Sequence, residues 1–389
     1  MTKKWSSRLT FFAFVVLMVG LGSNDSLRGI FSTIFQEHFS LTTTQLGLIV
    51  TASYIGNLVF LLVGGNLSTR FSKKRVLQVL ILIWMAALAL FAFTSNYTVL
   101  LIGMALALGS STLLNTTMNL ITPLLFATAP GFFVNFLFFT QEIGTSGSQY
   151  ILGSHADGFA FWQHTNLVLL ILGAVAFVLL LFCNVPEEAA DPADTPAQKG
   201  GYDWRIIVPY VLVFGFYFIA EHGVMNWMVA YGVDGLGLPQ ASAAKYLSVF
   251  FGGMMIGRLC LSPLVDKLGA LKSLAAFGGV SCVLYLIGSL GGALTMPVWA
   301  ISGLSFSILY PTLVMSIRLY FPAQQVSGAA GTILSIASLA DILFNVGFGK
   351  LVDMAGYAVS IRVLPLSVLA FFIVFMLFTK FCKPTQKLK

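Results

Sequence analysis

The stretch GNLSTRFSKKR, residues 65–75, separates two long apolar runs with a group of cations, and it decides how the chain is organised. A related stretch, SPLVDKLGALK, residues 262–272, separates another pair of apolar runs in the second half of the chain. Glycine, serine and charged residues between apolar runs are typical of connections between helices. The recurrence of this connection indicates that the chain consists of two related halves.

The composition around these connections is that of a membrane protein. Of the 389 residues, 58% are hydrophobic and only 9% are charged, whereas soluble domains contain about 25% charged residues. A helix needs about 20 apolar residues to cross a bilayer, and the sequence offers such stretches at roughly 9–34, 44–69, 76–95, 98–127, 131–153, 163–184, 206–233, 243–265, 271–292, 295–320, 327–352 and 359–381. Because these spans occupy nearly the whole chain, no soluble catalytic domain fits, and we predict that the protein is not an enzyme.

The cations indicate how the spans are oriented. The net charge of +7 comes from short clusters at the ends of spans, namely Lys3, Lys4 and Arg8; Arg70, Lys73, Lys74 and Arg75; and Lys380, Lys383, Lys387 and Lys389. Basic residues concentrate on the cytoplasmic side of membrane proteins. We therefore predict a multi-pass protein of the cell inner (plasma) membrane with both termini in the cytoplasm, and we expect no nucleic-acid partner.

Cofactors and metals are not indicated. The four cysteines, Cys183, Cys260, Cys282 and Cys382, lie in or at the ends of apolar spans and show no metal-binding spacing. We interpret them as packing residues, and we predict neither a metal site nor a cofactor.

The halves are divided by the polar stretch 186–203, which is rich in proline, aspartate and alanine and is predicted to be a cytoplasmic linker. The predicted division is therefore 1–185, 186–203 and 204–389. Short patterns related to the opening stretch start at Gly65, Gly153, Ser262 and Gly349, with the first and third copies 197 residues apart and the second and fourth 196. They predict four three-helix units, with the second and fourth copies on the outer side of the membrane.

The chain resembles the major facilitator superfamily over its whole length. GNLSTRFSKKR is similar to that family's loop signature Gly-x-Leu-x-Asp-Arg-x-Gly-Arg-Lys-Arg, except that Thr69 replaces the acid and Ser72 replaces the second glycine. The resemblance implies an all-α membrane protein with twelve transmembrane helices in two six-helix halves built from inverted three-helix repeats. It also implies a central site that opens alternately to each side. Gating is assigned to Arg70, to Asp266 in the second loop, and to Arg258 near the cytoplasmic end of its span.

Charged residues inside the spans are candidates for ion coupling, since a charge at the bilayer centre costs about 2.5 to 3.5 kcal/mol on insertion scales. The repeat offset places Asp25 and Glu221 at nearly the same depth in the two halves, and Glu142 and Asp341 in corresponding helices. Arg28, three residues after Asp25, can neutralise it or extend to the outer surface. Glu221 has no cation on its own helix face, so its partner must come from another helix. We predict Asp25 and Glu221 as proton carriers, with Glu142 and Asp341 in this role or as substrate ligands.

Uncharged polar residues predict a binding cavity. Asn115 and Asn119 are four residues apart and share one helix face. Amides and hydroxyls beside aromatic rings suit a sugar, although membrane helices also use such residues as interhelical hydrogen-bond partners. The predicted substrate contacts are Asn24, Asn115, Asn119, Gln141, Tyr217, Trp227 and Tyr310.

Two stretches narrow the resemblance to the fucose permease branch, the fucose:proton symporters. GLGSNDSLRG, 20–29, resembles the first helix of that branch, which implies a proton-linked role for Asp25. LLNTTMNLITP, 113–123, resembles its fourth helix, but Asn115 stands where the family has a functional acid. YFIAEHGVMNW, 217–227, is similar to its seventh helix.

The predicted function is proton-coupled symport of a small polar solute, a sugar or related polyol, by a monomer in the lipid bilayer. A proton-coupled exporter of drugs or metabolites is the alternative, for which walls drawn from the 35 Phe and 13 Met residues would suit apolar cargo. An intramembrane enzyme that uses Glu221 and His222 as acid and base is disfavoured, because adjacent positions on a helix do not face each other.

Overall fold

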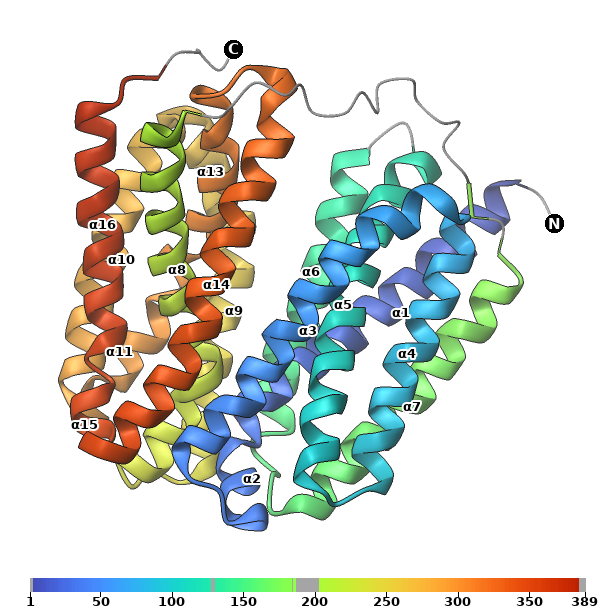
Figure 1. The fold of residues 1–389 in the computed structure, drawn as a ribbon, viewed down its shortest axis with the longest axis horizontal. Helices are drawn as coiled ribbons and strands as arrows, with labels where there is room; N and C mark the ends of the chain where they lie inside the picture. The colour runs from blue at the N-terminus through green and yellow to red at the C-terminus, as the bar shows by residue number, and fades with distance from the viewer. Residues whose placement is uncertain (1–2, 127–129, 184, 187–202, 385–389) are drawn as a thin grey trace. The chain divides into compact units, whose positions relative to one another are not determined.

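The computed structural model describes residues 3–126, 130–183, 185–186 and 203–384, apart from some side chains inside helices. The chain divides into two compact units, Met1–Asp191 and Pro192–Lys389 (Figure 1). Most of the predicted linker, 186–203, lies outside the described residues. Each unit is a bundle of long helices, and the described residues contain no β-strand.

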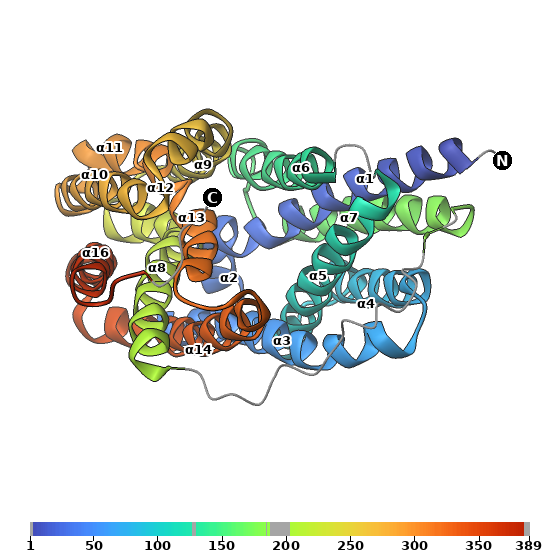
Figure 2. The ribbon, with the colours of Figure 1, turned by 90° about the horizontal axis from the view of Figure 1, so that it is seen from above.

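In the residues that the structure describes, the first unit contains six long helices and one short one. They are α1 (Lys3–Ile30), α2 (Ser32–Phe39), α3 (Thr43–Arg70), α4 (Lys73–Phe93), α5 (Tyr97–Leu125), α6 (Pro130–Ile151) and α7 (Phe159–Leu181). Helix α1 packs along α6, and α5 packs between α3 and α4 (Figure 2). Helix α7 covers α4 and α1. This packing brings α1, α5 and α6 together around the polar residues described below.

The second unit is less regular. It begins with α8 (Trp204–Ala230), the π-helical turn η1 (Tyr231–Gly235), α9 (Gln240–Leu268) and α10 (Ala270–Leu290). A series of five short helices follows: η2 (Gly292–Thr295), α11 (Met296–Ile301), α12 (Gly303–Phe306), α13 (Leu309–Ser316) and η3 (Ile317–Leu319). The unit ends with α14 (Ala323–Ala355), α15 (Tyr357–Ser360) and α16 (Val363–Phe381). Helix α8 lies against both α14 and α16. The predicted tenth span is thus several short helices rather than one.

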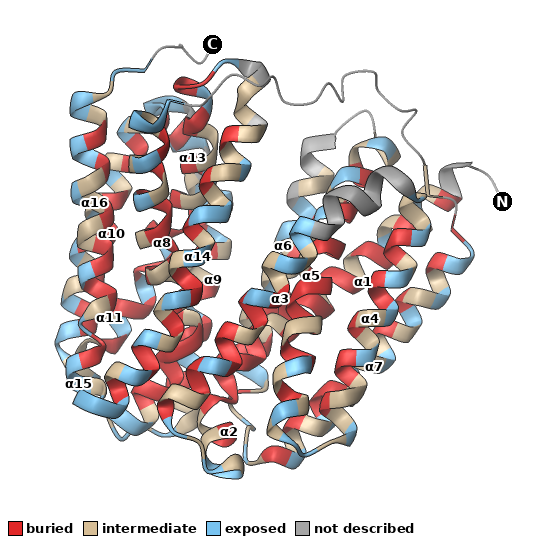
Figure 3. Ribbon diagram, viewed as in Figure 1, coloured by how far each residue is buried: buried red, intermediate tan, exposed pale blue. Residues whose placement is uncertain are grey.

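The helices have apolar outer faces, as membrane helices require. Within each unit, buried residues line the faces that the helices turn toward one another, and exposed residues line the outside (Figure 3). On α7 the exposed positions Val168, Ile171, Val175 and Val178 form one apolar stripe. Among the described residues, eleven segments are long and apolar enough to cross a membrane. The remaining predicted span, 131–153, corresponds to α6, so the all-α membrane fold is confirmed.

Two glycines allow α1 and α6 to approach each other closely. A Cβ atom added at Gly22 would lie 2.1 Å from the Gln141 carbonyl oxygen, and one added at Gly144 would lie 2.2 Å from the Val19 carbonyl oxygen. Small residues at such crossings let membrane helices pack backbone against backbone. The close approach sets the positions of Asp25 on α1 and Gln141 on α6.

We expect Gly144→Ala to destabilise the protein, because its new methyl group has no space at the α1–α6 crossing. Overpacking of this kind costs about 1 to 3 kcal/mol, more than the gain of about 1 kcal/mol from replacing glycine in a helix. Gly147→Ala on the same helix is the control, since nothing lies within 4 Å of its added Cβ. Thermal unfolding in detergent should show a lower midpoint for Gly144→Ala alone. Equal midpoints for both variants would contradict the close packing.

Candidate functional site

The first unit contains a polar cavity of about 390 Å³ between α1, α5 and α6. Its lining combines one carboxyl with hydroxyls, amides and two apolar side chains: Asp25, Ser111, Thr112, Asn115, Thr116, Asn119, Leu120, Phe138 and Gln141. Pockets for small ligands usually measure about 300 to 1,000 Å³. The predicted candidates Asp25, Asn115, Asn119 and Gln141 are therefore brought together in one cavity.

Hydrogen bonds order the side chains of this cavity. The Ser111 hydroxyl donates to Oδ2 of Asp25 at 3.1 Å. The Asn115 amide donates to Oε1 of Gln141 at 2.6 Å, and the Asn119 amide donates to Oδ1 of Asn115 at 2.6 Å. Ser111, Asn115 and Asn119 follow one another at four-residue intervals on α5, which places them on one face. The result is a hydrogen-bonded row of amides beside a carboxyl.

Two residues near the cavity have other partners. Arg28 is buried, with its guanidinium 5.7 Å from the centre of the Tyr54 ring, so it does not extend to the outer surface. It interacts electrostatically with Asp25. Asn24 is also buried, and its Oδ1 accepts a hydrogen bond from the Trp84 indole at 3.3 Å. The structure thus places Asn24 in the contact with α4 rather than in the cavity lining.

The second unit holds a charged cluster around two tyrosines. The rings of Tyr217 on α8 and Tyr310 on α13 stack with their centroids 5.9 Å apart. Glu221 interacts electrostatically with both tyrosines, and so does Arg258 from α9. The cation expected from another helix is therefore present in the same cluster as Glu221. The sequence predicted a gating role for Arg258, and the structure adds that Arg258 interacts electrostatically with Tyr217 and Tyr310.

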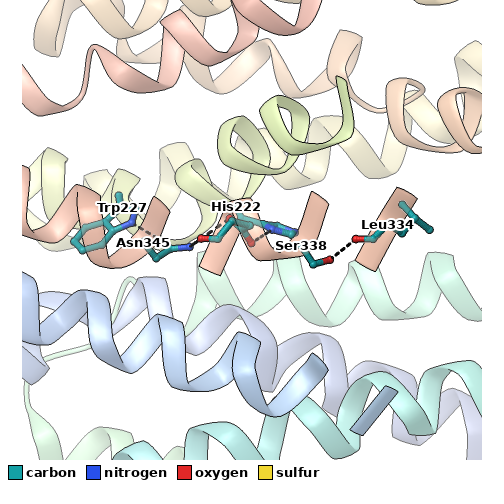
Figure 4. A network of polar contacts seen from close by, with 6 residues as sticks. His222, Trp227, Leu334, Ser338 and Asn345 are labelled. Atoms are coloured by element: carbon teal, nitrogen blue, oxygen red, sulfur yellow. Dashed lines mark hydrogen bonds and ion pairs between the residues drawn. The ribbon is translucent and has the colours of Figure 1, made fainter. Parts of the chain in front are cut away.

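A second polar group of this unit joins α8 to α14 (Figure 4). His222 Nδ1 lies 2.7 Å from Oδ2 of Asp341, whose side chain is 2% exposed. The Asn345 amide donates to Asp341, and the Trp227 indole donates to Asn345 Oδ1 at 3.0 Å. Trp227 is fully buried in this network. The sequence analysis considered His222 only for the disfavoured enzyme and did not name Asn345, although the four-residue spacing of Asp341 and Asn345 was a visible sign of a shared face.

The remaining predicted residues stay predictions. The side chains of Arg70 and Asp266 lie outside the described residues, so the structure says nothing about their gating role. Glu142 is half-buried on α6 and has an interaction partner. It is not among the residues that line the polar cavity.

Apolar helical units that surround a polar cavity are the features of a multi-pass membrane transporter. The chain belongs to the Major Facilitator Superfamily, whose family model matches residues 10–344. This membership confirms the resemblance drawn from the loop signature and the prediction that the protein is not an enzyme.

Relatives and solved structures agree with this membership. The chain is 23% identical to the L-fucose-proton symporter of Escherichia coli (strain K12) over 333 residues, which cover 74% of this chain and 75% of the relative. It is 26% identical to a glucose/galactose transporter of Brucella abortus over 341 residues, 82% of this chain and 81% of that one. The fold is similar to that of a D-xylose-proton symporter, with a TM-score of 0.77, 16% identity, and coverage of 99% of both chains.

Proposed function

We propose that the protein takes up a neutral sugar or related polyol together with protons. The observation that carries this proposal is the polar cavity of the first unit, in which amides and hydroxyls lie beside the Phe138 ring. Amides both donate and accept hydrogen bonds, as a ring of hydroxyl groups requires, while an aromatic face can cover the C–H surface of a sugar.

The relatives support the sugar assignment. Similarity to an L-fucose-proton symporter and to a glucose/galactose transporter favours a monosaccharide over an apolar drug. No cation is among the residues that line the described cavity. We therefore expect neutral sugars to bind better than sugar acids, whose carboxylates need a compensating positive charge.

Proton coupling is supported by the carboxyl in the cavity. Asp25 lines the space beside the amides and hydrogen-bonds to Ser111. A carboxyl next to the solute can exchange a proton with whichever side of the membrane hydrates it, so solute and proton can bind and leave together. We further propose that the protein resides in the inner membrane with both termini in the cytoplasm, as the cation clusters of the sequence indicate.

The test is counterflow in proteoliposomes that contain the purified protein. Fucose, glucose, galactose and xylose are compared with a sugar acid, a nucleoside and a hydrophobic cation. We expect exchange of at least one neutral sugar, and we expect Asn115→Leu to abolish it because the leucine removes the amide that binds Gln141. Val168→Leu, on the exposed face of α7, is the control. Transport of the hydrophobic cation alone would instead identify an exporter.

A further inference from the structure

The polar network between α8 and α14 has a definite direction of donors and acceptors. The indole nitrogen of Trp227 can only donate, so the atom it contacts on Asn345, at 3.0 Å, must be the amide oxygen. The Asn345 amide nitrogen then faces Asp341, 2.9 Å from its carbonyl oxygen and 3.3 Å from Oδ1. Asp341 Oδ1 is therefore an acceptor.

The same logic assigns the proton between Asp341 and His222. Oδ2 of Asp341 lies 2.7 Å from Nδ1 of His222. Since imidazole is a stronger base than a carboxylate, the shared proton lies on Nδ1, and His222 donates. The nitrogen at which His222 gains or loses a proton is then Nε2. The two side chains differ in exposure, 25% for His222 and 2% for Asp341, so the imidazole is the accessible member of the pair.

We propose that His222 is a proton-binding residue of the second unit, and that Asp341, Asn345 and Trp227 are positioning residues that hold it with Nδ1 as the donor. The inference rests on the proposed proton-coupled transport. When Nε2 binds a proton, the hydrogen bond from a neutral imidazole to the Asp341 carboxylate becomes an ion pair, which is the stronger interaction. Because Asp341 belongs to α14 and His222 to α8, proton binding strengthens the contact between these helices and favours the conformation that contains it.

Other ionisable groups lie on α8 and on the elements packed against it, and their own titration can contribute to the pH dependence of transport. Near the middle of the helices they are Glu221 and Tyr217 on α8 itself, Asp341 on α14, Arg258 on α9 and Tyr310 on α13. Nearer the ends they are Arg205 and Tyr210 on α8, Tyr231 and Asp234 in η1, Lys245, Tyr246, Cys260 and Lys267 on α9, Lys350 and Asp353 on α14, and Lys380 on α16. Among the described contacts, the Asp341 carboxyl lies 2.7 Å from Nδ1 of the His222 ring.

His222→Asn separates proton binding from the structural contact. The asparagine amide nitrogen lies near the position of Nδ1 and can still donate to Asp341, but the residue cannot bind a proton. We expect sugar counterflow to stay within about threefold of the wild type, while accumulation driven by a pH gradient falls about tenfold and loses its pH dependence. His164→Asn is the matched control, because His164 is exposed on α7. Unchanged accumulation and pH dependence in His222→Asn would overturn the proposal, as would an equal loss of both fluxes, which would indicate a substrate ligand or a structural residue.

A direct titration decides the proposal even where transport is lost. The chain has four histidines, so replacing His38, His155 and His164 with asparagine leaves His222 as the single histidine for nitrogen NMR of labelled protein. We expect Nδ1 to stay protonated while Nε2 titrates, and we expect Trp227→Phe, which removes the indole donor, to shift that titration. An imidazole that does not titrate between about pH 5 and pH 9, or that titrates at Nδ1, would refute the assignment. Lack of counterflow in the wild type would count against the proposed function, not against this titration.

Discussion

Asp25→Asn is expected to abolish the uphill accumulation of sugar while leaving counterflow intact. Of the residues that line the described cavity, Asp25 is the only one with a carboxyl group. Asparagine is close in size and can still accept the hydrogen bond from Ser111, but it cannot carry a proton. A gradient of about one pH unit supports about tenfold accumulation per proton. We expect the variant to reach only equal concentrations on both sides.

The measurement pairs uptake under a pH gradient with counterflow in the absence of one, in the same proteoliposomes. Glu37→Gln is the matched control, since Glu37 is an exposed carboxyl on the short helix α2. If Asp25→Asn still accumulates sugar, the proton must bind elsewhere. If both fluxes disappear and the protein remains folded, Asp25 is a sugar ligand instead.

The fold was predictable because apolar length and loop composition determine where membrane helices begin and end. The connection at residues 65–75 lies where α3 ends at Arg70 and α4 begins at Lys73. The interruption of the predicted span 295–320 was not foreseen. There the hydroxyls of Ser302, Ser305 and Ser307 bond to carbonyls three residues earlier, which competes with regular helix formation.

That interruption depends on packing that hydropathy does not report. A Cβ atom at Gly303 would lie 2.0 Å from the carbonyl oxygen of Phe250, so α9 passes directly over the break. A window of apolar residues has the same mean hydropathy whether its helix is continuous or broken. The contact between α9 and α12 arises only when the chain has folded.

In the candidate site, too, contacts within one helix were predictable from the sequence and contacts between helices were not. Helical spacing predicted that Asn115 and Asn119 share a face, and the structure adds Ser111 one turn earlier. Spacing within one helix cannot identify partners on another helix. For this reason the bond between Asn24 and Trp84 and the pair of His222 and Asp341 were visible only in three dimensions. Trp227 was predicted as a substrate contact from its residue type, whereas its indole is bonded to Asn345.

Glu221→Gln, in the second unit, is also expected to uncouple transport from the pH gradient. Glu221 is half-buried and shares a cluster with Tyr217, Tyr310 and Arg258. A charged carboxyl is costly inside a membrane helix, and Arg258, which acts electrostatically on the same two tyrosines, is the candidate counter-charge. Glutamine keeps the size and the hydrogen-bonding groups but removes the negative charge and the proton-binding oxygen. We expect exchange to continue and accumulation to fall about tenfold for each pH unit of gradient.

The double variant Glu221→Gln with Arg258→Gln tests whether the charge balance is the cause. If the two residues act as a pair, the double variant should unfold at a higher temperature than Arg258→Gln alone. The double variant leaves neither charge without its counterpart. Thermal unfolding reports the pairing, and the paired fluxes report the coupling. Additive losses of stability would show that the two charges act independently. If Glu221→Gln retains both fluxes, the carboxyl is structural and the coupling role falls to Asp25 and His222. If both fluxes fall together, Glu221 binds the sugar.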